Sequence, residues 1–167
     1  MVTVDGTDFK ISDPSPFSSG WYSHKFKGPG VRYEVALSIN GGDIAHINGP
    51  FPCGFNPDIH IFCSKLIHML EEGEMVEADR GYRGEPTKVR IPVDYMSNHQ
   101  RRQKNHARAR QEMVNRPFKQ FGALSQHFHH RVTMNDMKKH KVVFYAIAVI
   151  TQISINNGAK FFPVIIH

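Results

Sequence analysis

The sequence predicts an α/β fold in which helices flank a mixed sheet whose N-terminal part is antiparallel. Three observations predict it: short β-prone runs fill the first third of the chain, an amphipathic helix and another short strand follow, and two long helical patterns come last. The chain of 167 residues contains no linker, repeat or low-complexity tract. We therefore expect a single domain over residues 1–167.

The predicted strands lie between turns rich in Gly, Pro and Asn. The run VTVD at residues 2–5 is β-prone and is expected to end at Gly6. Runs at residues 21–27 and 31–39 flank Gly28-Pro29-Gly30, which predicts a hairpin. A further turn leads to a short strand at residues 44–47. The segment that follows, GPFPCGFNP, is expected to be a loop.

The first helix is expected to begin near Pro57, with Asn56 or Asp58 as its cap. Its apolar side chains recur every three or four residues until Gly73, as one face of a helix requires. A strand at residues 75–78 then runs into Asp79. Residues 85–98 are polar and contain two prolines, so they are expected to be irregular.

Two helices are expected in the last part of the chain. The first is basic and runs from His99 to Asn115, continuing past Pro117 toward residue 121. The second runs from Met137 to Asn156 and has many apolar side chains available for burial. Gly158 follows it as a C-cap.

The composition excludes several classes of protein. Apolar residues make up 40% of the chain and charged residues 22%, as in a globular protein. The longest apolar stretch, residues 142–155, is shorter than the about 20 residues that span a bilayer, and the N-terminus resembles no signal peptide. Cys53 and Cys63 match no metal motif and are expected to stay reduced. We therefore expect an intracellular protein with no membrane partner.

The positive charge is concentrated in one segment. The formal net charge is +6, and residues 99–119 hold seven basic side chains and one acid, Glu112, so this segment carries the whole excess. Such a segment indicates a polyanion partner, since Lys and Arg displace counterions from phosphates. A solvated helix face or a nuclear-import patch remains the alternative. The basic residues are Arg101, Arg102, Lys104, Arg108, Arg110, Arg116 and Lys119.

Three acids stand at positions that favour a catalytic site. Asp5 and Asp79 each end a predicted strand, and sites in open α/β sheets gather at strand ends. Together with Glu112 they would repel one another unless metal cations neutralise them. Two Mg²⁺ or Mn²⁺ ions about 3.5–4 Å apart can cleave a phosphodiester bond. Taken singly, the aspartates can be turn residues and Glu112 can pair with Arg108, so the pattern alone leaves both interpretations open.

Several sequence blocks resemble one known family. They are VDGTDFKI, PSPFSSGWYSHKFKGPGVRYEVALSI, INGPFPCG, EADRGYRGE, HARARQEMVNRPFKQFGALSQHFHH and VVFYAIAVITQISINNG. In this order they cover nearly the whole chain. The chain resembles the DDE-superfamily endonuclease domain of PIF/Harbinger-type transposases and of transposase-derived nucleases.

The resemblance implies an RNase H-like fold and a metal-dependent DNA endonuclease. It implies Asp5, Asp79 and Glu112 as catalytic and metal-binding residues, with two Mg²⁺ or Mn²⁺ ions. Asp58 is an accessory acid or a rival for the second position. The seven basic residues of segment 99–119 are expected to bind DNA. The resemblance also implies a nuclear location and a possible separate DNA-binding partner protein.

Two departures from the family pattern favour a second interpretation. Pro117 interrupts the helix that carries Glu112, and the strand before Asp5 is short, as if the domain were truncated at its N-terminus. The alternative is therefore a catalytically inactive module that binds DNA or a protein. A zinc site at His127, His129 and His130 is a third interpretation.

Overall fold

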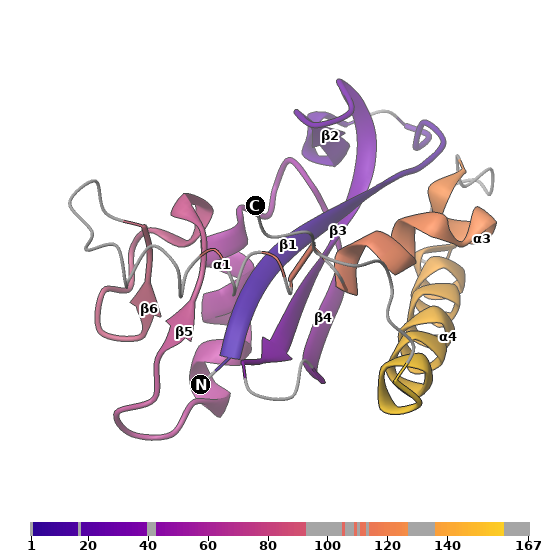
Figure 1. The fold of residues 1–167 in the computed structure, drawn as a ribbon. Coiled ribbons are helices and arrows are strands. Elements are labelled where there is room, and N and C mark those ends of the chain that lie inside the picture. The colour runs from indigo at the N-terminus through magenta and orange to yellow at the C-terminus, as the bar shows by residue number, and fades with distance from the viewer. Residues whose placement is uncertain are drawn as a thin grey trace.

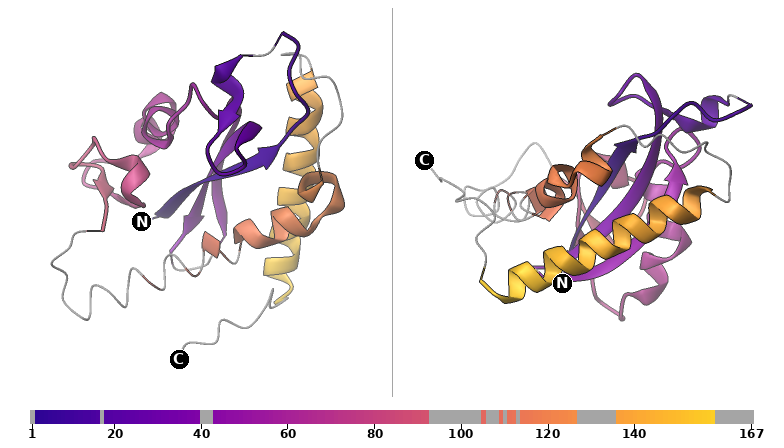
Figure 2. Two further views of the ribbon diagram at one scale, coloured as in Figure 1. Left: turned by 90° about the horizontal axis from the view of Figure 1, so that it is seen from above. Right: turned by 90° about the vertical axis from the view of Figure 1, so that its right-hand side faces the viewer.

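The computed structural model describes residues 2–16, 18–39, 43–92, 105, 109, 111–112, 114–126 and 136–158. A sheet of six strands lies at its centre, with helix α1 against one face and helices α3 and α4 against the other (Figures 1 and 2). The strands are β1 (Val2–Lys10), β2 (Tyr22–Ser23), β3 (Gly28–Ser38), β4 (Ile44–Pro52), β5 (Val76–Glu77) and β6 (Val89–Arg90). The helices are α1 (Asp58–Ser64), α3 (Gly122–Ser125) and α4 (Asp136–Asn156), and residues 114–120 are also helical.

The sheet confirms the predicted fold class. Its order is β2-β3-β1-β5-β6, and β4 pairs with β3 outside this order. The early strands β1, β3 and β4 are antiparallel, whereas β5 is parallel to β1 and β6 is parallel to β5. This is a mixed sheet flanked by helices, consistent with an α/β RNase H-like fold.

The expected break at Gly6 is wrong. β1 continues through Gly6 to Lys10, because each residue from Val2 to Lys10 pairs with β3. A glycine in a strand costs only about 1 kcal/mol relative to alanine, and nine paired residues outweigh that.

The first hairpin turn also differs from the expectation. Gly28-Pro29-Gly30 belongs to β3, and the turn lies at residues 24–27, where Lys27 has a φ of 53°. The strand predicted over residues 21–27 is limited to the two residues of β2. Further on, β4 extends to Pro52, so the GPFPCGFNP segment is partly a strand.

The middle of the chain is more broken than its pattern indicates. The helix expected up to Gly73 ends at Ser64 and is followed by a 3-10 helix, Leu66–Met69. Two 3-10 turns lie elsewhere, at Ser19–Trp21 and Arg80–Tyr82. The segment 85–98 contains β6, which the sequence did not reveal because only two residues pair with β5.

The later helices agree with the sequence where the structure describes them. Helical residues continue past Pro117 to residue 120, as predicted. α4 ends at Asn156 and Gly158 follows with a φ of 70°, which confirms the glycine C-cap.

Each face of the sheet has its own core. On one face, Phe9 and Tyr33 pack against Phe118 and Phe144, and the rings of Tyr33 and Phe144 stack with centroids 3.8 Å apart. On the other face, α1 and the turn at Tyr82 cover Val4, Ala36 and Val76, and Phe62 is fully buried in the same cluster. Cys53 and Cys63 are both free. None of the described helices combines the length and apolar character needed to cross a membrane.

Candidate active site

Asp5 and Asp79 are brought together by the pairing of two parallel strands. β1 and β5 pair Val2 with Val76 and Thr3 with Glu77. Extending this residue pairing by two residues along both segments places Asp5 beside Asp79. At that point β5 has ended, whereas β1 continues. The charge of Asp79 also contributes to raising the pKa of Asp5, so the two carboxylates lie near each other.

Asp58 joins this pair from the start of α1. A Cβ atom built on Gly81 would lie 2.8 Å from Oδ2 of Asp58 and 3.0 Å from Oδ1 of Asp79, so the two oxygens are no further apart than the sum of these distances. A Cβ on Gly6 would clash with Oδ1 of Asp58. Only glycine at these two positions lets the three acids approach one another.

The expected capping role of Asp58 is wrong. Pro57 is the N-cap residue of α1, and no side chain makes a capping hydrogen bond there. The side chain of Asn56 bonds to the carbonyl oxygen of Pro52 instead, and that of Asp58 turns toward Arg32. The accessory role of Asp58 stays a prediction.

The electrostatics of the three acids reflect their proximity. Burial raises the pKa of Asp5 to about 6, and the charges of Asp79 and Asp58 add to this rise while Lys25 opposes it. Burial likewise raises the pKa of Asp58, against the effect of Arg32 and Lys25. Crowded carboxylates of this kind favour either a proton or a cation.

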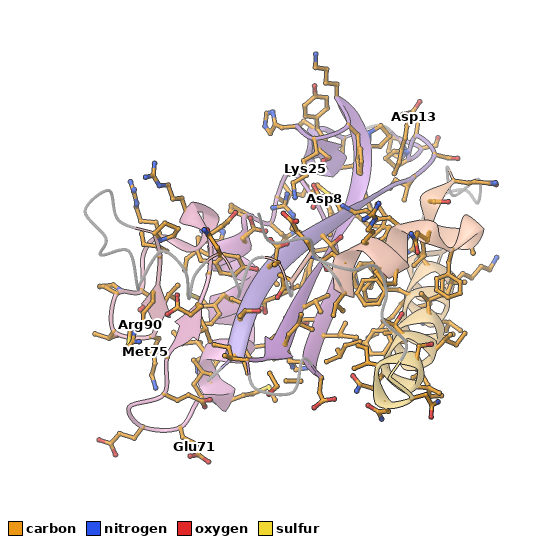
Figure 3. The ribbon with its side chains drawn as sticks, viewed as in Figure 1. Asp8, Asp13, Lys25, Glu71, Met75 and Arg90 are labelled. Carbon is orange, nitrogen blue, oxygen red and sulfur yellow. The ribbon has the colours of Figure 1, made fainter. Side chains whose placement is uncertain are left out.

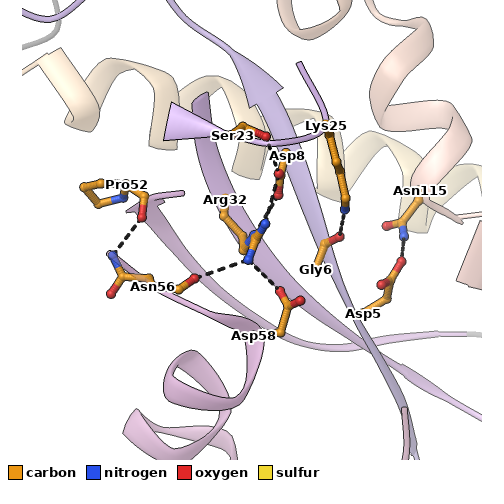
Figure 4. A network of polar contacts seen from close by, with 10 residues as sticks. All are labelled: Asp5, Gly6, Asp8, Ser23, Lys25, Arg32, Pro52, Asn56, Asp58 and Asn115. Carbon is orange, nitrogen blue, oxygen red and sulfur yellow. Dashed lines mark hydrogen bonds and ion pairs between the residues drawn. The ribbon is translucent and has the colours of Figure 1, made fainter. Parts of the chain in front are cut away.

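A buried network anchored on Arg32 holds the acids in place (Figure 4). Arg32 donates from Nε to Oδ1 of Asp8 (2.7 Å) and from Nη2 to Oδ2 of Asp8 (3.0 Å). Its Nη1 lies 3.1 Å from Oδ1 of Asp58. Ser23 donates a further bond to Asp8, and these contacts lower the pKa of Asp8 although burial alone would raise it. Lys25, which lies near Asp8 (Figure 3), bonds to the carbonyl oxygen of Gly6 (3.2 Å).

Asn115 is the helical residue that contacts Asp5. Its Nδ2 donates a hydrogen bond of 2.8 Å to Oδ2 of Asp5 (Figure 4). Glu112, which the sequence predicts for this role, is exposed three residues earlier. The structure therefore brings Asp5, Asp58 and Asp79 together with Asn115, and the role of Glu112 stays a prediction.

The basic segment is described only in part. Arg116 and Lys119 are exposed on the helical residues 114–120. Arg101, Arg102, Lys104, Arg108 and Arg110 lie outside the described residues, as do the three histidines of the predicted zinc site.

Comparison with known protein families decides the identity of this domain. The model described as DDE superfamily endonuclease matches residues 4–152. The chain belongs to the DDE superfamily endonuclease family. No curated protein and no solved structure matches it.

A divalent cation is the cofactor that this family implies. Whether it fits this endonuclease domain depends on the side chains that could act as its ligands. Within the described residues, no three His, Cys, Asp or Glu side chains are spaced to hold a metal ion. An amide oxygen is also a suitable ligand for Mg²⁺ or Mn²⁺. Oδ1 of Asn115 is buried without a hydrogen-bond partner among the described residues, so aspartates and amide together fit a divalent cation.

Sequence reasoning missed four residues that shape this site: Asp8, Arg32, Gly81 and Asn115. Their roles depend on contacts between distant parts of the chain, such as the 110 residues that separate Asp5 from Asn115. One signal was available for Asn115. Val114 and Phe118 are apolar at helical spacing, which sets residue 115 on the buried side, with residue 112 one turn earlier at the exposed edge.

Proposed function

We propose that the chain is a divalent-metal-dependent DNA endonuclease domain derived from a Harbinger-type transposase. It hydrolyses phosphodiester bonds with two Mg²⁺ or Mn²⁺ ions. The observation that carries the proposal is the alignment of Asp5 with Asp79 beside β1, with Asp58 against both, in a chain of the DDE endonuclease family.

In this proposal Asp5, Asp79 and Glu112 hold the cations, and Asp58 is an accessory acid or a rival for the second position. When bound, the cation polarises the scissile phosphate and lowers the pKa of the attacking water. The protein's own contribution is positional. Arg32 fixes Asp58 through an ion pair, and the hydrogen bond from Asn115 fixes the carboxylate of Asp5.

DNA is the proposed substrate, held by the basic segment. Arg116 and Lys119 are exposed on the helical residues that follow Asn115, so they lie on the same element as a side chain of the site. Arg101, Arg102, Lys104, Arg108 and Arg110 extend this basic charge in the sequence. We also propose a nuclear location and recruitment by a separate DNA-binding protein.

The test is nicking of supercoiled plasmid in Mg²⁺ or Mn²⁺. We expect the wild-type chain to nick the plasmid and Asp79→Asn to abolish nicking without unfolding the domain. Asp13→Asn is the matched control, because Asp13 is exposed and lies apart from Asp5 in the described contacts. Cleavage that persists in Asp79→Asn, or in excess chelator, would contradict the proposal.

One observation favours a second function. An amide, rather than a third carboxylate, contacts Asp5, which suits a catalytically inactive domain that has kept its DNA-binding segment. That domain would bind DNA with steep salt dependence and show no cleavage with any divalent ion. Neutralising Arg101, Arg102 and Lys104 together would weaken its binding to all DNA sequences.

A further inference from the structure

Helix α4 is apolar on two opposite sides. Between Lys141 and Gly158 it carries no charged residue. Phe144, Ile147 and Ala148 are buried on the side that faces the sheet. Six apolar residues lie exposed on the opposite side and form the α4 patch: Val142, Tyr145, Ala146, Val149, Ile150 and Ile153. A helix that is apolar on both sides is normally covered on both, so the α4 patch is expected to have a partner.

The described part of the chain leaves the α4 patch open to solvent. α4 is the outermost helix on its side of the sheet (Figure 2). Val142 is 69% exposed, Val149 58% and Ile153 54%. Together the six side chains expose on the order of 400 Å² of apolar surface, which is large for a single patch on a monomer and typical of an interaction site.

The spacing of the α4 patch is that of two packed helices. Four of its residues form a straight row along the helix, at steps of four, three and four residues. They are Val142, Ala146, Val149 and Ile153, and we refer to them as the α4 row. Such steps form the line of contact along which two helices pack side by side. Tyr145 and Ile150 flank the row on either side.

The α4 row is complementary to itself when two copies run in opposite directions. The pair Val142 and Ile153 and the pair Ala146 and Val149 have the same midpoint, between residues 147 and 148. A two-fold axis at that midpoint brings Val142 level with Ile153 of a second copy, and Ala146 level with Val149. A two-fold interface requires a self-complementary surface of this kind, and the small Ala146 lets the two helices approach closely.

The charges on α4 favour the antiparallel arrangement over the parallel one. Lys138, Lys139 and Lys141 all lie at the N-terminal end of the helix. A parallel pair would place the lysines of both copies side by side, where they repel one another. An antiparallel pair separates them. It also brings each Lys138 level with Asn157 of the other copy, where the last carbonyl groups of the helix carry a partial negative charge.

We propose that the chain forms an antiparallel two-fold dimer through the α4 row, with a second copy of this chain as the partner. This inference does not depend on the proposed endonuclease function. The two α4 patches together offer roughly 800 Å² of apolar surface, below the about 1,200 Å² at which stable interfaces begin. The dimer therefore forms reversibly, at micromolar concentrations.

The first test is sedimentation velocity of the purified full chain from about 1 to 200 μM, where we expect the monomer to give way to a dimer. Val149→Lys places a charge near the centre of the contact in both copies, so it should raise the Kd of the dimer by about tenfold or more. Met69→Lys is the matched control. Met69 is 57% exposed on the 3-10 helix that follows α1, so this variant should dimerise as the wild type does.

Disulfide cross-linking tests the direction of the two helices. On oxidation, an equimolar mixture of Val142→Cys and Ile153→Cys chains should give a cross-linked dimer. Either variant alone should not, because its two new cysteines lie about 16 Å apart along the helix pair, too far for a disulfide. The wild-type chain, whose Cys53 and Cys63 are free, gives the background level.

Three results would overturn the proposal. The first is a chain that stays monomeric at the highest concentration, which would leave another occupant, such as residues 159–167, to cover the α4 patch. The second is cross-linking in either cysteine variant alone that equals the cross-linking in the mixture. The third is growth beyond a dimer, which marks an open contact rather than a closed two-fold one. All three results are independent of nicking activity, so loss of the endonuclease function would leave this proposal standing.

Discussion

Arg32 and Asp58 form an ion pair of 3.1 Å between β3 and the first residue of α1. The guanidinium is 13% exposed and the carboxylate 21%, so water screens the pair only in part. Arg32 also holds Asp8, whose side chain is fully buried. One cation therefore compensates two acids next to the candidate active site.

Arg32→Gln is expected to destabilise the fold. The change would leave Asp8 and Asp58 buried without their counter-ion, which typically costs about 3 kcal/mol or more in the free energy of unfolding. Urea denaturation at pH 7 measures this loss.

Arg90→Gln is the control for that measurement. Arg90 is 56% exposed and lies 4.0 Å from Glu77, in a part of the sheet away from Asp8 (Figure 3). Surface pairs of this kind contribute little, so the expected change is below about 0.5 kcal/mol. A comparable loss in both variants would show that Arg32 has no special role.

Gly81→Ala is expected to weaken metal binding. The new Cβ would lie 2.8 Å from Oδ2 of Asp58 and 3.0 Å from Oδ1 of Asp79, so the two carboxylates would have to separate. A site whose ligands are displaced commonly binds its metal about tenfold more weakly or worse. Titration with Mn²⁺ measures that loss.

Gly122→Ala is the matched change outside the site. The nearest atom to its Cβ is Nε2 of Gln126 at 4.0 Å, and Gly122 begins the helix α3. Alanine there should keep the Mn²⁺ affinity and can raise stability by up to about 1 kcal/mol. An unchanged affinity in Gly81→Ala would mean that Asp58 and Asp79 do not act on the same ion.

The sequence could predict the acids of the site but not their supports. Asp79 is visible because a strand end followed by a glycine turn is a local pattern, whereas Asp5 was singled out by the same pattern although it lies within β1. Asp8, Arg32 and Asn115 are not visible, because their partners depend on a strand register and a helix rotation set by distant core contacts. The same reason explains the error at Gly6, where pairing with β3 outweighs a local break.

The helix that carries Glu112 illustrates this limit. In the sequence Glu112 is the one acid in a basic helix, which draws attention to it. In the structure the apolar spacing of Val114 and Phe118 decides which side of the helix faces β1, and that side carries Asn115. Helical periodicity predicts which residues of this helix are buried, and the role of Glu112, three residues from Asn115, stays a prediction.

Neutralising Arg116 and Lys119 together is expected to weaken DNA binding at every sequence. Both side chains are exposed on the helical residues after Asn115. Each phosphate contact that is lost should reduce the slope of log K against log salt by about 0.9, so the double change to Gln should reduce it by about 1–2. Fluorescence anisotropy with labelled duplex DNA at several salt concentrations measures the slope.

The same charge loss on another helix provides the comparison. Lys138 and Lys141 are exposed on α4, and their double change to Gln should leave the slope unchanged. If both double variants reduce the slope equally, the net charge of the chain, not the segment after Asn115, governs DNA binding.

Glu34 gives the domain a pH-dependent stability. It is fully buried on β3, and burial first, then the charge of Asp58, raise its pKa from an ordinary value near 4.5 to about 8. The folded domain therefore keeps this proton at pH values where the unfolded chain has lost it. More protons are bound in the folded state, so the free energy of unfolding falls as the pH rises toward 8 and is constant above it.

The window from about pH 6.5 to 8 covers the upper part of the Glu34 titration. The raised pKa of Asp5, about 6, and the lowered pKa of His140, about 4, both lie below it. Each pH unit is worth about 1.4 kcal/mol for one proton, so the wild type should lose about 2 kcal/mol across the window. Glu34→Gln cannot ionise and should keep its stability, which urea denaturation at the two pH values will show; an equal loss in the variant would place the titrating group elsewhere.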